Sequence, residues 1–409
     1  MNENEGDAVM LTQPFKQALP ILETIINHGY EAYFVGGCVR DLILERDIHD
    51  IDIATSASPY EIQQIFEKVI PVGIEHGTVI VRHHHESYEV TTFRIDGKYS
   101  DQRHPDAVEF VRDIHEDLKR RDFTMNALAI DIHGRVIDLF KGSEDINQKM
   151  IRTVGNSYDR LKEDPLRIIR ALRFSSQLGF NIAKDTLQSM QDLRNSIQTL
   201  ATERILSEFE KLIKGTYINS AFQYLKNLKI DQSLPIFKEY PALIGLLRED
   251  VQPFRSFAEF ITLFHQLDGS VSIHTWVKSW KCSNKTKHEA IALNEALIYF
   301  RYHGLDTYLL YLLPQDLDQS FLNVLDRLFL DHQVTNDVIK TIRSTIVIES
   351  KRDLLINGND LIKMYPDLKK GKWIQDLLQR MEKAVVLNEV RNTKYELKEW
   401  IKCNPPVIN

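Results

Sequence analysis

Two aspartates separated by one residue, in the segment HDIDI, are spaced to hold divalent metal ions. Asp50 and Asp52 lie among Ile48, Ile51 and Ile53, whose β-branched side chains favour a strand. Because successive side chains of a strand point to opposite faces, both carboxylates would point the same way. The same pattern is common on half-exposed strands, so the pair alone is more often structural than catalytic.

A glycine pair just upstream adds a second chemical element. Gly36 and Gly37 leave backbone N–H groups open to phosphates, although a glycine pair alone is usually a turn. A phosphate cradle beside a two-metal platform is what metal-dependent transfer of a nucleotide needs. The two features in one short segment therefore favour a catalytic site.

A third carboxylate and a polar segment follow. Glu89, in YEVTT, would complete the metal site, and a solvent-facing strand glutamate is equally compatible with the pattern. Two cations sharing three carboxylates with triphosphate oxygens would suit Mg²⁺. The segment from Phe93 predicts either a loop that closes over a substrate or a solvated linker. The run His83–His85 predicts a hairpin tip, since neighbouring strand side chains diverge.

The segment RRDFTMNALAI offers groups that recognise a nucleotide. Arg120 and Arg121 are planar donors for phosphate, and Asn126 could reach a ribose hydroxyl. Taken alone, the arginine pair is more often a surface charge cluster.

The segment from Asp159 to Phe174 could select a base. If it is helical, Asp164 and Arg167 lie three residues apart on one face. A carboxylate only accepts and a guanidinium only donates, so the pair matches the amino group and ring nitrogen of cytosine or adenine. Guanine and uracil present their hydrogen-bond donor and acceptor in the opposite order, so they would leave the pair without partners. The alternative is that Asp164 caps the helix and Arg167 is its ion-pair partner.

The same segment carries a basic stripe. Arg167, Arg170 and Arg173 recur every three residues beside an apolar stripe. We expect either a surface that meets an RNA end or a solvated helix face.

The elements that would position these residues form an α/β region followed by a helical one. Apolar residues at helical spacing predict a helix over residues 16–30 that ends near Gly29. A second helix is predicted to begin at Ser58–Pro59. After about residue 150 nearly every segment shows helical periodicity. Strands are predicted at residues 32–35, 50–54, 78–82, 88–92, 108–111, 127–131 and 136–139.

Composition narrows the class of protein. The 409 residues are 43% hydrophobic and 27% charged, which is ordinary for a globular chain of two to four domains. The net charge of -7 argues against a positively coated surface but allows local basic stripes. Three scattered cysteines predict a reducing compartment. Without a signal-peptide pattern or a bilayer-spanning apolar run, we expect a cytoplasmic protein with no membrane partner.

Five segments together resemble the class II CCA-adding enzymes, tRNA nucleotidyltransferases of the polymerase-β-like superfamily. They are VGGCVRDLILERDIHDIDIAT, EVTTFRIDGKYSDQRHPD, RRDFTMNALAID, EDPLRIIRALRF and ATERILSEFEKLI, and they cover residues 34 to about 213. The later INGNDLIKMYPDLKKGKWIQDLL is similar to the family's C-terminal tail. The resemblance implies an α+β fold, with a mixed-sheet nucleotidyltransferase head at 1–150 followed by an all-helical neck, body and tail at 151–215, 216–290 and 291–409.

The resemblance also implies roles for individual residues. Asp50, Asp52 and Glu89 would bind Mg²⁺ and form the catalytic centre, while Glu163 would orient Asp164 and Arg167 as an amino-acid template. The implied nucleotide-binding residues are Gly36, Gly37, Arg40, Arg121, Asp122, Asn126, Arg160, Glu163, Asp164, Arg167 and Arg170. The implied flexible loop contains Phe93, Arg94, Asp96, Gly97, Tyr99, Arg103, His104 and Pro105, and the implied RNA-binding residues are Arg173, Lys369, Lys370 and Lys372.

The implied reaction adds CMP twice and AMP once, from CTP and ATP, to the 3′ end of tRNA without a nucleic-acid template. An A-adding or poly(A) polymerase shares the head, but PVGIEHGTVIV lacks the basic, aromatic stretch that marks poly(A) polymerases. An enzyme that adds only CC would lack the flexible loop. A non-catalytic RNA-binding protein would not need intact Asp50 and Asp52. The sequence leaves a monomer and a homodimer equally open.

Overall fold

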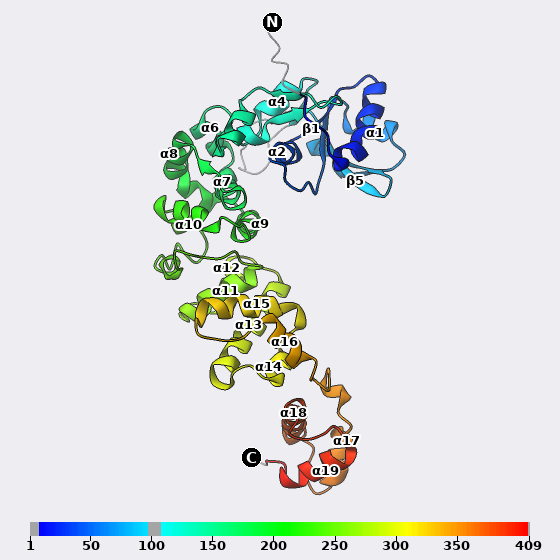
Figure 1. Cartoon of the computed structure of the whole chain (residues 1–409), viewed down its shortest axis with the longest axis vertical. Coiled ribbons are helices and arrows are strands. Elements are labelled where there is room, and N and C mark those ends of the chain that lie inside the picture. Colours follow the sequence, from blue (N-terminus) through cyan, green and yellow to red (C-terminus); the bar gives the residue numbers. More distant parts are fainter. Residues whose placement is uncertain (1–7, 97–107, 408–409) are drawn as a thin grey trace. The chain divides into compact units, whose positions relative to one another are not determined.

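The computed structural model describes residues 8–96 and 108–407, and the chain divides into two compact units, Met1–Pro253 and Phe254–Asn409. Strands and helices alternate in the early part of the first unit, and the described part of the second unit is helical (Figure 1). The domain boundaries predicted at residues 150, 215 and 290 stay predictions.

A seven-stranded sheet forms the first part of the first unit (Figure 1). In order across the sheet, the strands are β3 (Val69–Gly73), β4 (Thr78–His83), β5 (Glu86–Thr92), β2 (Asp52–Thr55), β1 (Ala32–Val35), β8 (Leu128–Ile130) and β9 (Val136–Asp138). β2 is antiparallel to β1 and parallel to β5. The predicted mixed sheet is therefore confirmed.

Most strands lie within two residues of their predicted positions. β4 and β5 form a hairpin whose tip is His84 and His85, with φ of 45° and 70°, as predicted for the histidine run. β3 was not predicted, because Pro71 interrupts it and it lies at the sheet edge with Ile70 and Val72 exposed.

The predicted strand at 50–54 is wrong at its start. β2 begins at Asp52, where its pairing with β5 begins, and Asp50 lies before the strand. Strand alternation therefore does not explain how Asp50 and Asp52 are placed relative to one another.

Short helices accompany the sheet. α1 (Gln13–Asn27) buries Phe15, whose ring packs edge-on against Phe34 of β1 at 4.8 Å. α3 (Pro59–Ile65) begins as predicted, with a capping box between Ser58 and Glu61. The remaining elements of this part are α2 (Gly37–Ile43), α4 (Ile114–Lys119), α5 (Gly142–Asn147), the 3₁₀ helices η1 (Ile74–His76) and η2 (Thr124–Asn126), and the antiparallel pair β6 (Arg94–Asp96) and β7 (Val108–Phe110).

The rest of the first unit is mostly helical. Its helices are α6 (Ser157–Glu163), α7 (Leu166–Leu178), α8 (Lys184–Leu193), α9 (Thr202–Ile213) and α10 (Ile218–Asn227). One exception to the predicted all-helical neck is β11 (Asn181–Ile182), which pairs in parallel with β10 (Met150–Ile151).

The second unit packs its helices around apolar cores. One core gathers Trp373, Leu377, Met381, Leu397 and Ile401 from its last helices. Across the described residues, no helix is both long and apolar enough to cross a membrane. The helices are α11 (Phe257–Leu267), α12 (Ile273–Ser279), α13 (Asn284–His303), α14 (Thr307–Leu312), α15 (Asp318–Leu328), α16 (Asn336–Arg343), α17 (Gly358–Met364), α18 (Lys372–Val386) and α19 (Lys394–Cys403).

Candidate active site

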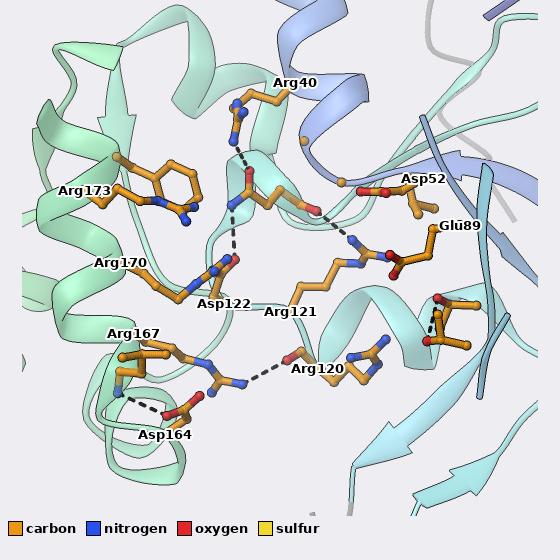
Figure 2. Close-up of a pocket in the computed structure, with 18 of the residues that line it drawn as sticks. Arg40, Asp52, Glu89, Arg120, Arg121, Asp122, Asp164, Arg167, Arg170 and Arg173 are labelled. Atoms are coloured by element: carbon orange, nitrogen blue, oxygen red, sulfur yellow. Dashed lines mark hydrogen bonds and ion pairs between the residues drawn. The ribbon is translucent and has the colours of Figure 1, made fainter. Parts of the chain in front are cut away.

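A cavity of about 820 Å³ in the first unit gathers most of the predicted site residues. Figure 2 shows Arg167, Arg170 and Arg173 on one side of it and Asp52 and Glu89 on the other. The predicted residues that line it are Gly36, Gly37, Arg40, Asp52, Glu89, Arg94, Arg121, Asp122, Asn126, Asp164, Arg167, Arg170 and Arg173. Other lining residues include Arg120, Phe174, Gln177, Arg204 and Lys211.

Asp52 and Glu89 form the acidic wall. They are register partners on the parallel strands β2 and β5, so their side chains project from the same face of the sheet. Burial, followed by the charge of Glu89, raises the pKa of Asp52 to about 6, while Arg121 opposes the rise and Asp50 adds to it. The exposed Asp50 therefore acts on Asp52 through its charge.

The acidic wall fits a hard divalent cation. Two neighbouring carboxylates with excess negative charge attract such an ion, and oxygen ligands are those that Mg²⁺ prefers. Across the part of the chain that the structure describes, no three His, Cys, Asp or Glu side chains are placed to hold a metal by themselves. Mg²⁺ commonly completes its shell with water and substrate phosphates, so an incomplete protein cage is compatible with it.

The glycine pair lets an arginine approach the backbone. Gly36 has a φ of 75°, and a Cβ atom at this position would lie 2.8 Å from Nη1 of Arg121. Arg121 is held by the buried Asp117, whose carboxylate also accepts from Arg120 at 2.9 Å. Burial opposes ionisation of Asp117, but the two arginines keep its pKa below the usual range. The positive φ therefore favours glycine at position 36, and a side chain there would displace the guanidinium of Arg121.

A chain of hydrogen bonds joins α2 to α7. Arg40 donates to Oδ1 of Asn126 at 2.7 Å, and Nδ2 of Asn126 donates to Asp122 at 3.2 Å. Asp122 also accepts from Arg170 at 2.8 Å. Burial opposes ionisation of Asp122, but Arg170 lowers its pKa to about 2. The Asn126 side chain, predicted to meet a ribose, is hydrogen-bonded to two protein side chains in this structure.

The segment from Asp159 to Phe174 is not one helix, so the condition for placing Asp164 and Arg167 on one helix face is not met. α6 ends at Glu163, Asp164 has an extended backbone, and α7 starts after Pro165. Proline disfavours a helical conformation in the residue before it, which explains the break. Asp164 accepts from the backbone N–H of Leu166, the first residue of α7, at 3.1 Å, but the N-cap residue of that helix is Pro165. The capping alternative is therefore met only in that Asp164 binds the first N–H of the helix.

Arg167 pairs with Glu163 rather than with Asp164. Its Nη1 lies 2.9 Å from Oε2 of Glu163 and donates to the Arg160 carbonyl at 2.7 Å. The same Glu163 oxygen accepts from Arg160 at 3.0 Å. Arg167 and Arg173 are only 7% and 8% exposed, so a solvated basic stripe is excluded.

α9 supplies partners that the predicted set lacked. Arg204 bonds the second oxygen of Asp164 at 3.1 Å, and the buried Glu208 lies 2.8 Å from Arg173 and 3.5 Å from Arg170. Their spacing of four residues places both on one helix face, which is a signal that ATERILSEFEKLI carried without indicating which surface it would meet.

Asp50, Arg160 and Glu163 are predicted site residues that do not line the cavity. The residues predicted for the flexible loop and for RNA binding are placed as follows. Phe93 is fully buried and stacks on Tyr33, so it belongs to the core rather than to a loop. Arg94 lies in β6, lines the cavity and donates to the His76 carbonyl. Asp96 ends β6, while Gly97, Tyr99, Arg103, His104 and Pro105 lie outside the described residues. Lys369, Lys370 and Lys372 are exposed residues of the second unit.

Sequence comparisons identify the family of the chain. The profile of the Poly A polymerase head domain matches residues 32–152, that of the RNA- and SrmB-binding site of polymerase A matches 179–240, and that of tRNA nucleotidyltransferase domain 2 matches 253–401. The CCA-adding enzyme of Oceanobacillus iheyensis is 50% identical over 98% of this chain and 100% of its own length. The chain belongs to the CCA-adding enzymes. It is accordingly a tRNA nucleotidyltransferase.

Other CCA-adding enzymes extend the similarity. That of Staphylococcus epidermidis is 40% identical over 95% of this chain and 98% of its own length. The crystal structure of the Bacillus stearothermophilus CCA-adding enzyme in complex with CTP superposes with a TM-score of 0.86. It is 35% identical and covers 96% of this chain and 98% of that one. The α+β fold is thus that of a known CCA-adding enzyme along nearly the whole chain.

Proposed function

We propose that this protein adds C, C and A in turn to the 3′ end of tRNA, using CTP and ATP and releasing pyrophosphate. The observation that carries the proposal is that one cavity joins Asp52 and Glu89 to Asp164 and Arg167. Chemistry and base choice can therefore act on the same nucleotide. The B. stearothermophilus relative with bound CTP supports a nucleotide ligand for this cavity.

The acidic wall would hold the reacting phosphate. Mg²⁺ ions held by Asp50, Asp52 and Glu89 would activate the terminal 3′-hydroxyl and stabilise charge during in-line attack on the α-phosphorus. The backbone at Gly37 and the cationic side chains of Arg40, Arg121 and Arg170 would bind the phosphate oxygens. The Gly36 N–H already donates to the Leu128 carbonyl at 3.2 Å, so position 36 would contribute the close approach of the backbone rather than a donor. The protein itself would then orient the triphosphate and supply positive charge to its oxygens.

Base selection would use the hydrogen bonds that the protein leaves available. Asp164 carries about four acceptor sites, and Leu166 and Arg204 use two of them. Nη1 of Arg167 donates to Glu163 and to the Arg160 carbonyl, while Nη2 donates only to the Arg120 carbonyl, at 3.4 Å. The amino group of cytosine or adenine would donate a hydrogen bond to Asp164, and the neighbouring ring nitrogen would accept one from Arg167. Guanine or uracil would leave these polar groups unpaired, which costs about 1–3 kcal/mol for each.

The RNA partner would be the acceptor end of tRNA. Arg173 at the cavity and the exposed Lys369, Lys370 and Lys372 of the second unit are the proposed contacts. Contacts to phosphates would recognise shape rather than sequence.

One assay separates this reaction from its rivals. A tRNA that ends at the discriminator base is incubated with CTP, ATP and Mg²⁺, and the products are sized on a gel. We expect a gain of three nucleotides, C, C and A. A gain of two would indicate a CC-only enzyme and a long A tail a poly(A) polymerase. Absence of any product would indicate an RNA-binding protein without catalysis.

A further inference from the structure

One phenyl ring in the cavity wall supports three guanidinium groups. The guanidinium carbons of Arg173, Arg40 and Arg170 lie 4.2, 5.2 and 5.5 Å from the centroid of Phe174. Arg40 comes from α2, whereas Arg170 and Arg173 come from α7, the helix that carries Phe174. The ring is only 4% exposed. Cations within about 6 Å of an aromatic centroid are attracted by its quadrupole, most strongly where water is excluded.

Each of these arginines also has an acidic partner. Arg40 pairs with Asp41, Arg170 with Asp122 and Arg173 with Glu208. Carboxylates bind the N–H edge of a guanidinium, whereas an aromatic ring attracts its cationic group through the face of the ring. Phe174 thus attracts the three guanidinium groups without adding negative charge to the cluster. The cluster therefore keeps its positive charge for binding an anion.

The ring also contacts both ends of a path of hydrogen bonds that runs from Arg40 to Arg170. Arg40 bonds Asn126, Asn126 bonds Asp122, and Asp122 bonds Arg170. Because Arg40 and Arg170 both lie over Phe174, the ring joins the two ends of this path. The cluster brings like charges together, and burial followed by the charge of Arg170 lowers the pKa of Arg173 to about 10. An attraction common to all three arginines offsets part of that repulsion.

We propose that Phe174 is a positioning residue, whose ring holds Arg40, Arg170 and Arg173 in the arrangement that binds substrate phosphate groups. The inference rests on the proposed function. The phosphates belong either to the nucleoside triphosphate or to the RNA 3′ end. In both cases the ring acts through the arginines and leaves the chemical step unchanged.

The test compares Phe174→Leu with Phe222→Leu. Phe222 on α10 is 3% exposed and packs edge-on against Phe209. Phe222→Leu therefore removes a similar amount of buried ring packing without removing a cation–π contact. CTP binding without tRNA and the KM for tRNA are measured separately, together with kcat at saturation and the unfolding midpoint. For Phe174→Leu we expect a loss of about tenfold in one of the two affinities, with kcat changed less than about threefold. Weaker CTP binding assigns the cluster to the triphosphate, and a raised tRNA KM assigns it to RNA.

A second series separates electrostatics from packing. Phenylalanine carrying one to five fluorine atoms at position 174 keeps the ring's shape while weakening its attraction for cations. We expect the affected affinity to fall stepwise with fluorination, whereas Phe174→Tyr retains it. Affinities that stay constant through the series, or a Phe174→Leu variant that matches Phe222→Leu in both affinities, would overturn the inference. Wild-type protein that adds no CCA would instead refute the proposed function.

Discussion

The Asp52 carboxylate lies where its own ionisation is unfavourable. Burial and the charge of Glu89 raise its pKa to about 6 from an ordinary value of 3.8. Above pH 6 the Asp52 carboxylate is therefore ionised in the folded protein, where ionisation costs more free energy than in the unfolded chain. A bound cation would relieve this conflict, so the same residue should weaken the metal-free fold and serve the reaction.

Replacing Asp52 by asparagine should stabilise the metal-free protein. The native pKa is raised, so the penalty is absent below about pH 4, grows between pH 4 and 6, and is complete above pH 6. In EDTA at pH 8, we expect the free energy of unfolding of Asp52→Asn to rise by about 1–3 kcal/mol, because one pKa unit equals about 1.4 kcal/mol. Denaturant unfolding at pH 8 and pH 4 measures it.

The same variant should lose nucleotide addition while still binding tRNA. Asp159→Asn, at an exposed carboxylate of the same unit, is the control and should change neither stability nor activity. A stability gain that is equal at both pH values would contradict the role of ionisation, and retained nucleotide addition would refute the metal assignment.

At the scale of elements, the proposed base choice would depend on a break between two helices and on a third helix packed beside them. Asp164 lies at the break between α6 and α7, and its two oxygens are held by the first turn of α7 and by α9. Arg204 of α9 has no role in the proposed chemistry, but it determines where the Asp164 carboxylate points. In the proposed mechanism, α9 would therefore contribute to base selection.

Sequence reasoning succeeded where the signal was local. Alternating apolar residues identified most strands, and Ser58, Pro59 and Glu61 marked the start of α3. It failed where tertiary contacts decide. The start of β2 depends on pairing with β5, and the partners of Arg170 lie 48 residues upstream at Asp122 and on α9 at Glu208. No local period encodes such pairings.

Removing Arg204 should relax base selection. In Arg204→Ala, Asp164 keeps only its bond to Leu166 N–H, so its carboxylate can turn away from the base. We expect the kcat/KM ratio of CTP over UTP to fall about fivefold, corresponding to about 1 kcal/mol for an indirect loss. Arg167→Ala removes the donor itself and should have the larger effect. Steady-state kinetics with each nucleotide measure both.

Ser207→Ala is the control, since Ser207 is an exposed residue of the same helix. Its selectivity should equal that of the wild type. An Arg204→Ala variant with unchanged selectivity would return Arg204 to a purely structural ion pair.

At the scale of the whole molecule, charge is distributed unevenly. The net charge is -7, yet eight arginines are among the residues that line the cavity, and the second unit exposes Lys369, Lys370 and Lys372 around the start of α18. Trp373, which is 9% exposed, donates to the Lys369 carbonyl at 2.8 Å and anchors this segment to its core. A polyanion should therefore be drawn to local basic sites while the rest of the surface repels it.

Replacing Lys369, Lys370 and Lys372 together by alanine should weaken tRNA binding alone. Each lost phosphate contact lowers the magnitude of the slope of log affinity against log salt by about 0.7–0.9. For three lysines we expect the slope to fall by up to about 2.7 and the tRNA KM to rise several-fold. CTP affinity without tRNA should not change, because the cavity lies in the first unit. The control replaces Lys278, Lys285 and Lys340, three separated, exposed lysines of the second unit, with the same change in net charge. If both triple variants weaken tRNA binding equally, overall charge rather than this segment attracts the RNA.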